Sequence, residues 1–316
     1  MKVSVLLMIV SLFFLIPAFT QTSDRVTHEG INNPVDFSSL MFSAEYASNT
    51  NIMGVFNRET KQPSFSPSMA FFSKWGADFS VLGYFVDNSD DSLDHYTSEL
   101  DLILGYSIKP TEMLTIYPSY EHYFYSVNSN ALKSMFTDDI RLDVDYDYKF
   151  FNIGISAGYF MGKQNAFYAA AHNYYRVNIN RFLFRNVSLS IQPGIDANFG
   201  SYEYLNLYYI HELKEDPSLY VYLLSYPAIR HYIYYEKMRH PALTYKEILD
   251  NYLEEKAQDN FKLTTVGINL PVYFMMGSFG MNFGLYAQIP IGQPDYMTDD
   301  VQFFFDISLT YDLMFK

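Results

Sequence analysis

Apolar and polar residues alternate along much of the chain. The stretch "DDIRLDVDYDYKF", residues 138–150, shows the pattern most clearly. Its apolar parity comprises Ile140, Leu142, Val144, Tyr146 and Tyr148, and its charged parity comprises Arg141, Asp143, Asp145, Asp147 and Lys149. A two-residue period is typical of a β-strand with two unlike faces. The same period recurs in 185–199, 279–290 and 301–315.

The length of these alternating segments separates two kinds of sheet. An ordinary globular strand has about 5–6 residues, whereas a tilted strand that crosses a membrane needs roughly 9–11. Because several segments exceed that length, the pattern favours membrane-spanning strands. The predicted strands are 38–47, 66–74, 77–87, 96–108, 112–126, 138–149, 151–162, 166–180, 185–199, 261–275, 279–290 and 301–315.

The connections between these strands alternate in length. Links after even-numbered strands are short, such as "KPTE" and "MGS". Links after odd-numbered strands are mostly long and polar, and the largest is the segment 200–260. This alternation is typical of a membrane barrel whose two rims face different compartments. An even number of strands then brings both ends of the barrel to the rim with the short turns.

The N-terminus and the composition narrow the compartment and the partners. Lys2 precedes an apolar run that ends near Phe19, which is the pattern of a secretory signal peptide over 1–20 with cleavage near Thr20 or Gln21. A membrane anchor is the alternative interpretation of this run. The net charge of −14 argues against a nucleic-acid partner. The absence of cysteine excludes disulfides and thiolate chemistry.

Together, the exported N-terminus, the alternating strands, the two classes of link and the aromatic last strand resemble Gram-negative outer-membrane β-barrel proteins. The resemblance implies an all-β fold: a closed antiparallel transmembrane up-and-down barrel of about twelve strands over 38–316. It implies a periplasmic segment at 21–37, a location in the cell outer membrane, and outer-membrane lipid around the barrel. It also implies that the barrel-assembly machinery recognises the last strand through Phe315, although Lys316 follows it.

The polar parity predicts an acidic interior. Its candidate lumen-lining residues are Glu45, Glu99, Asp101, Glu121, Arg141, Asp143, Asp145, Asp147, Lys149, Asp196, Asp306 and Asp312. Carboxylates that line a pore attract cations. We therefore expect either a narrow channel that prefers cations and passes small polar solutes, or an interior that is filled by paired polar side chains.

The segment 200–260 does not follow the strand period and is predicted to be largely helical. In "TYKEILDNYLEEKAQ", Thr244 and Glu247 form a capping-box pattern at the start of a helix. Position after an odd-numbered strand assigns this insertion to an extracellular loop, where it could be a plug, a cap or a binding surface. The candidate plug or partner surface comprises Tyr226, Arg230, His231, Tyr234, Tyr235 and His240.

No sequence pattern indicates catalysis or a cofactor. His122 lies beside Glu121 in "SYEHYFYS", but adjacent strand residues point to opposite faces. No histidine spacing matches a standard zinc site. We therefore predict no enzyme activity, no metal and no cofactor. Two functions follow: a cation-preferring channel, or a non-conducting scaffold whose insertion binds an extracellular ligand or partner.

Overall fold

The computed structural model describes residues 38–49, 51–52, 55–56, 63–87, 96–125, 136–162, 165–180, 182, 187–200, 220–221, 223–257, 261–291 and 301–315. The predicted signal peptide and the segment 21–37 lie outside these residues, as do residues 88–95, 126–135, 201–219 and 292–300.

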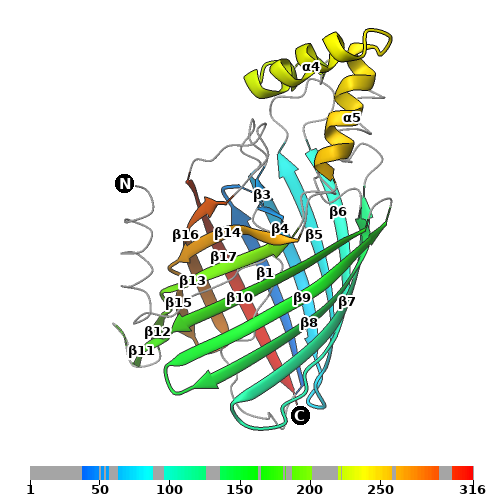
Figure 1. Cartoon of the computed structure of the whole chain (residues 1–316). Helices are drawn as coiled ribbons and strands as arrows, with labels where there is room; N and C mark the ends of the chain where they lie inside the picture. Colours follow the sequence, from blue (N-terminus) through cyan, green and yellow to red (C-terminus); the bar gives the residue numbers. More distant parts are fainter. Residues whose placement is uncertain are drawn as a thin grey trace, which may run out of the picture.

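The described strands form one sheet that closes on itself (Figure 1). The strands are β1 (Ser38–Ala47), β4 (Ser64–Phe72), β5 (Ala77–Asp87), β6 (Tyr96–Tyr106), β7 (Leu114–Tyr125), β8 (Phe136–Tyr148), β9 (Phe151–Gly162), β10 (Ala166–Tyr175), β11 (Val177–Asn180), β12 (Val187–Ile191), β13 (Gly194–Gly200), β14 (Lys262–Asn269), β15 (Val272–Met276), β16 (Phe279–Pro290) and β17 (Gln302–Phe315). Two short strands, β2 (Asn51–Ile52) and β3 (Val55–Phe56), pair separately.

The barrel is antiparallel and up-and-down. Each strand pairs with the next one along the chain, and β17 pairs with both β16 and β1. Three strands of the barrel are each interrupted by a short break and so carry two labels: β10 and β11, β12 and β13, and β14 and β15. Counted in this way the barrel has twelve strands, as predicted, and each predicted boundary lies within two residues of an observed one.

Prolines mark two of the three strand breaks. Pro193 separates β12 from β13, and Pro271 separates β14 from β15. Proline has no N–H to give to the ladder, but both proline carbonyls still accept hydrogen bonds. Tyr175 donates to Pro193 at 3.1 Å, and Gln192 donates to Pro271 at 3.0 Å. The wall of the barrel therefore continues across the breaks.

The two rims differ as the lengths of the links predict. Short turns at 73–76, 149–150 and 277–278 close one end, which we call the short-turn rim. Ser38 pairs with Phe315 at that rim, so the barrel begins and ends there. The opposite end, the long-loop rim, carries helices α4 (Pro227–Arg239) and α5 (Tyr245–Ala257) (Figure 1). Among the described residues, no helix is long and apolar enough to cross a membrane.

Candidate functional site: the barrel interior and its helical cap

The two faces of the wall differ in chemistry, and β8 shows the difference over its whole length. Ile140 and Leu142 are 52% and 47% exposed on the outside. Asp143, one residue further along, is only 1% exposed and faces the interior. A shift by one residue would bring the charged set into contact with lipid, so this alternation determines the register.

The outer surface is apolar around the whole barrel. Exposed aromatic and aliphatic side chains occur on strands from β1 to β17. A closed sheet leaves no unpaired edge in hydrocarbon, and an apolar outside with a polar inside is the arrangement of outer-membrane barrels. The chain is a β-barrel of the outer-membrane type.

Comparisons with known proteins give weak similarities to solved structures. No family model matches the sequence, and no curated protein matches it. Among solved structures, the KdgM porin is 6% identical, with 86% of this chain and 98% of that chain covered and a TM-score of 0.43. The COG4313 outer membrane channel from Pseudomonas putida F1 is 9% identical, with 92% and 100% covered and a TM-score of 0.42.

Structures with different activities are similar to this barrel. The outer membrane phospholipase (OMPLA) of Salmonella typhi is 9% identical, with 90% of this chain and 93% of that chain covered and a TM-score of 0.32. Because all three identities are below 10% and all three TM-scores are below 0.5, the likeness concerns the barrel architecture and carries no argument about activity. Evidence about function comes from this chain's own residues.

The predicted lumen-lining residues lie on inward-facing positions, with one exception. Glu45, Glu99, Asp101, Glu121, Arg141, Asp143, Asp145, Asp147, Asp196, Asp306 and Asp312 all follow the inward parity of their strands. Lys149 does not line the lumen. Strand β8 ends at Tyr148, and Lys149 is exposed in the turn with a φ of 56°, its Nζ 5.1 Å from the centre of the Tyr148 ring. In the sequence the alternation continues one residue past the end of the strand, into the turn. The prediction that Lys149 lines the lumen is therefore wrong.

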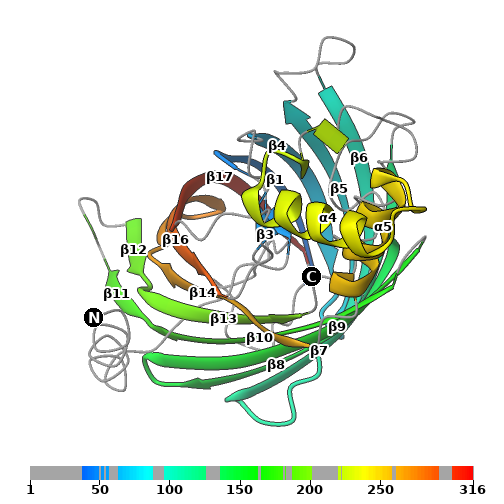
Figure 2. The same ribbon diagram turned by 45° about the horizontal axis from the view of Figure 1, so that its top comes forward.

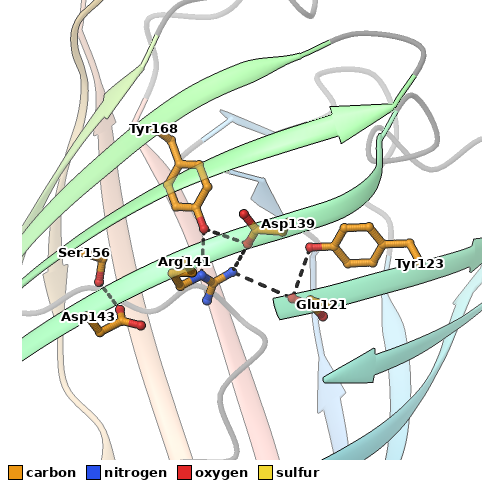
Figure 3. A network of polar contacts seen from close by, with 7 residues as sticks. All are labelled: Glu121, Tyr123, Asp139, Arg141, Asp143, Ser156 and Tyr168. Atoms are coloured by element: carbon orange, nitrogen blue, oxygen red, sulfur yellow. Dashed lines mark hydrogen bonds and ion pairs between the residues drawn. The ribbon is translucent and has the colours of Figure 1, made fainter. Parts of the chain in front are cut away.

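Arg141 is the centre of a polar network on the inner wall (Figure 3). Its Nε donates to the Tyr168 hydroxyl at 2.7 Å, and its Nη2 donates to Asp139 Oδ2 at 3.0 Å. Glu121 Oε2 lies 3.9 Å from Nη2 and accepts a hydrogen bond from Tyr123 at 3.1 Å. The network thus places one guanidinium between two carboxylates.

Side chains of β8 and β10 meet across the strand between them. The inward positions in the middle of β9 are occupied by the small residues Gly154, Ser156 and Gly158. Over Gly154, His172 Nε2 lies 2.7 Å from Asp145 Oδ1. A Cβ built at Gly154 would lie 2.2 Å from that same nitrogen, and one at Gly158 would lie 2.3 Å from the Tyr168 ring. These glycines are covered by neighbouring side chains. They therefore do not leave open space in the lumen, although small inward residues in a sequence favour an open lumen.

Inward polar side chains also meet across strands elsewhere in the barrel. Over Gly105 of β6, the Tyr117 hydroxyl donates to Asp78 Oδ1 at 2.7 Å. On β13, Asp196 accepts hydrogen bonds from the amides of Asn269 and Asn198, both at 2.9 Å. Many inward polar side chains are therefore hydrogen-bonded to other side chains of the wall.

Several interior residues were not predicted as site residues. Asp139, which is 1% exposed, and His172 both follow the inward parity, so the alternation carried a signal for them. Asp78 lies on a strand whose alternation is weak. Whether a side chain reaches across a strand depends on the residues of the neighbouring strands. The hydrogen bond between Asp78 and Tyr117 therefore could not be predicted from one segment.

The helices pack onto the inner wall near the long-loop rim. Ile248, Leu249, Tyr252 and Leu253 of α5 are at most 4% exposed. They belong to one buried cluster with Ile229 and Ile233 of α4 and with wall residues Tyr123, Phe136, Phe160, Ala166 and Tyr168. Helices α4 and α5 are thus seated on strands β7 to β10, and we call them the helical cap (Figure 2).

The predicted capping box starts α5. The backbone N–H of Thr244 donates to Glu247 Oε2 at 2.6 Å, and the N–H of Glu247 donates to Thr244 Oγ1 at 3.1 Å. The hydrogen bonds from the Thr244 backbone and hydroxyl lower the pKa of the Glu247 carboxyl. This reciprocal bonding satisfies two donors that a helix start leaves free.

The candidate partner surface divides into two parts. Arg230, His231, Tyr234, Tyr235 and His240 are exposed, and they lie along α4 or just past its end. Tyr226 instead packs against the buried cluster. Arg239, which was not predicted, lies with its Cζ 5.1 Å from the centre of the Tyr235 ring. The exposed face of α4 therefore combines cations with aromatic rings.

His122 and Glu121, which are adjacent in the sequence, point to opposite faces of the wall. His122 faces outward, with its Nδ1 2.8 Å from Asp138 Oδ1 and its ring 4.5 Å from that of Phe124, while Glu121 faces inward. Within the described ranges, no group of three His, Asp or Glu side chains is placed to hold a metal ion.

Proposed function

We propose that the barrel is a narrow, cation-preferring channel for small polar solutes. One observation supports the proposal: inward carboxylates greatly outnumber inward cationic groups among the described residues. The cationic groups of the wall are Arg141, Arg176 and Lys262, which lies opposite the inward Gly200, with His172 as a fourth when it is protonated. The carboxylates are those of Glu45, Asp78, Glu99, Asp101, Glu121, Asp139, Asp143, Asp145, Asp147, Asp196, Asp306 and Asp312.

The physical reason is the low dielectric of the membrane. An uncompensated carboxylate in a barrel interior attracts a mobile cation more strongly than it would in bulk water. Arg141 neutralises only part of its surroundings because Asp139 and Glu121 both lie within 3.9 Å of it. The remaining negative charge favours entry of cations and opposes entry of anions.

The test is single-channel recording of the refolded full chain in a planar bilayer with a salt gradient. We expect steady current and a reversal potential on the cation-selective side. A reversal potential on the anion-selective side would contradict the cation preference. Silence across repeated insertions, verified by protease-resistant barrel in the same membranes, would contradict the channel itself.

The exposed face of α4 supports a second function, a scaffold that binds an extracellular partner. Tyr234 and Met238 are 67% and 66% exposed, beside Arg230 and Arg239. Aromatic residues, Met and Arg are enriched at protein interfaces. Binding to cells or to secreted proteins that is lost in a Tyr234→Ser, Tyr235→Ser variant, with conductance absent, would favour this scaffold over the channel.

A further inference from the structure

Inward side chains differ in their access to solvent within the half of the barrel next to the long-loop rim. On the wall formed by β6 to β10, Asp101 is 0% exposed, Glu99 3% and Glu121 5%. The aromatic residues beside them, Tyr123 and Tyr168, are 2% and 3% exposed. On this wall the charged groups are therefore covered by other side chains.

The helical cap packs on this same wall. Its apolar residues join Tyr123, Phe160 and Tyr168 in one cluster. These three wall residues come from β7, β9 and β10 and face the interior just below the cap. The cap thus covers one side of the mouth by packing on it. Solvent and solutes are displaced from that side.

No residue of β17 or β1 belongs to the buried cluster under the helical cap, although Met41, Ala47 and Asp306 of this wall are buried. Glu45 of β1 and Ser308 of β17 are half-buried, and they lie opposite each other in the strand register. Phe304, also inward on β17, is half-buried as well. Further down, Ser43 and Ser68 share a hydrogen bond of 2.6 Å and are both half-buried. Several inward side chains of this wall are therefore reached by solvent, and most of them are polar.

Glu45 differs from the other carboxylates at this level. Asp306, which lies diagonally across the register from it, is 4% exposed and accepts a hydrogen bond from the Asn282 amide at 3.1 Å. Glu121 and Asp139 surround Arg141 on the covered wall. A carboxylate that solvent reaches can contact a passing ion directly, whereas a buried one acts only through intervening atoms.

We propose that the permeation path runs along the β17–β1 wall and that Glu45 determines its cation preference near the long-loop rim. This inference rests on the proposed channel function and specifies where the selectivity lies. A single charge about 5 Å from a hydrated ion changes its local concentration about fourfold at the dielectric constant of water. The same substitution on the covered wall has a smaller effect, because the ion does not approach it.

The first experiment compares two matched variants in the full-length protein. Glu45→Gln and Glu99→Gln remove the same charge with little change of shape. We expect the cation-to-anion permeability ratio, measured from reversal potentials, to fall at least about fourfold in Glu45→Gln, because the same charge enriches cations and depletes anions, and less than about 1.5-fold in Glu99→Gln. An equal fall in both variants, or a larger fall in Glu99→Gln, would overturn the inference while leaving the channel in place.

A second measurement does not depend on current. The natural chain has no cysteine, so a single introduced thiol reports its own accessibility. Ser308→Cys and Ala170→Cys place thiols on the two walls, and Ala170 is 6% exposed on β10. We expect a charged, membrane-impermeant methanethiosulfonate to modify the Ser308→Cys variant at least tenfold faster. Equal rates would overturn the inference.

The two measurements separate the two proposals. Fast modification of the Ser308→Cys variant in a barrel that carries no current would support the position of the water-filled path and contradict the channel function. Current with an unchanged permeability ratio in Glu45→Gln would support the channel and overturn the role of Glu45.

Discussion

Gly154 is a position where a single added methyl group should disrupt the inner wall. A Cβ at this position would lie 2.2 Å from His172 Nε2 and 2.4 Å from Asp145 Oδ1, the two groups that pair above it. Gly154→Ala therefore forces apart a hydrogen-bonded pair that is held on both sides by strands. Gly200 is the matched control, since it also faces inward and its nearest neighbour to a built Cβ is 3.9 Å away.

The magnitude follows from three contributions. Replacing glycine by alanine at a compatible position stabilises by about 0.4–1 kcal/mol through the unfolded chain. At Gly154 the clash costs about 1–3 kcal/mol, and loss of a charged hydrogen bond costs about 1.5–3 kcal/mol. The net expectation is a loss of about 2–5 kcal/mol for Gly154→Ala, against a gain of up to about 1 kcal/mol for Gly200→Ala.

The assay is reversible denaturant unfolding from detergent micelles, followed by far-UV circular dichroism and by the fluorescence of Trp75, the single tryptophan. A double variant with His172→Ala tests the cause, because removal of the imidazole should relieve most of the clash and give a coupling energy of about 1–3 kcal/mol. If Gly154→Ala were as stable as Gly200→Ala, the packing of β8 and β10 side chains across β9 would be refuted.

Three further outcomes are expected. Val144→Lys should cost about 2–4 kcal/mol of insertion free energy if Val144 lies near the membrane midplane, while the inward Asp145→Lys should still insert; equal insertion into vesicles would contradict the register. Leu253→Ala, at a residue that is 0% exposed, should cost about 2–5 kcal/mol and expose the helical cap to limited proteolysis, and unchanged protease resistance would contradict its seating. Thr244→Ala should weaken the start of α5 by about 1 kcal/mol. The folded-state pKa of Glu247 is lowered, so its contribution is present at neutral pH and is lost as the pH falls below the ordinary glutamate range. The difference in proteolysis between Thr244→Ala and the natural chain should therefore narrow in acid, while the bond from the Glu247 N–H to Thr244 Oγ1 keeps the natural chain more resistant.

The barrel itself could be predicted from the sequence because its determinants are local. A strand with lipid on one side and water on the other must alternate, and residues 140–148 show this alternation without any knowledge of their neighbours. The lengths of the links then order the strands, since an up-and-down barrel pairs each strand with the next. Thr244 and Glu247 likewise specify the start of α5 within four residues.

The tertiary structure decided how the interior is used. Side chains that meet across a strand, such as Asp145 with His172 over Gly154, are separated by 27 residues along the chain, and no periodicity links them. The position of the helical cap was not predictable either. Its apolar face indicates that it is buried but not which wall it covers. Whether Glu45 is reached by solvent and Glu99 is not depends on that packing. A charge pattern along the chain determines which residues face inward, but burial is a property of what the folded chain places in front of them.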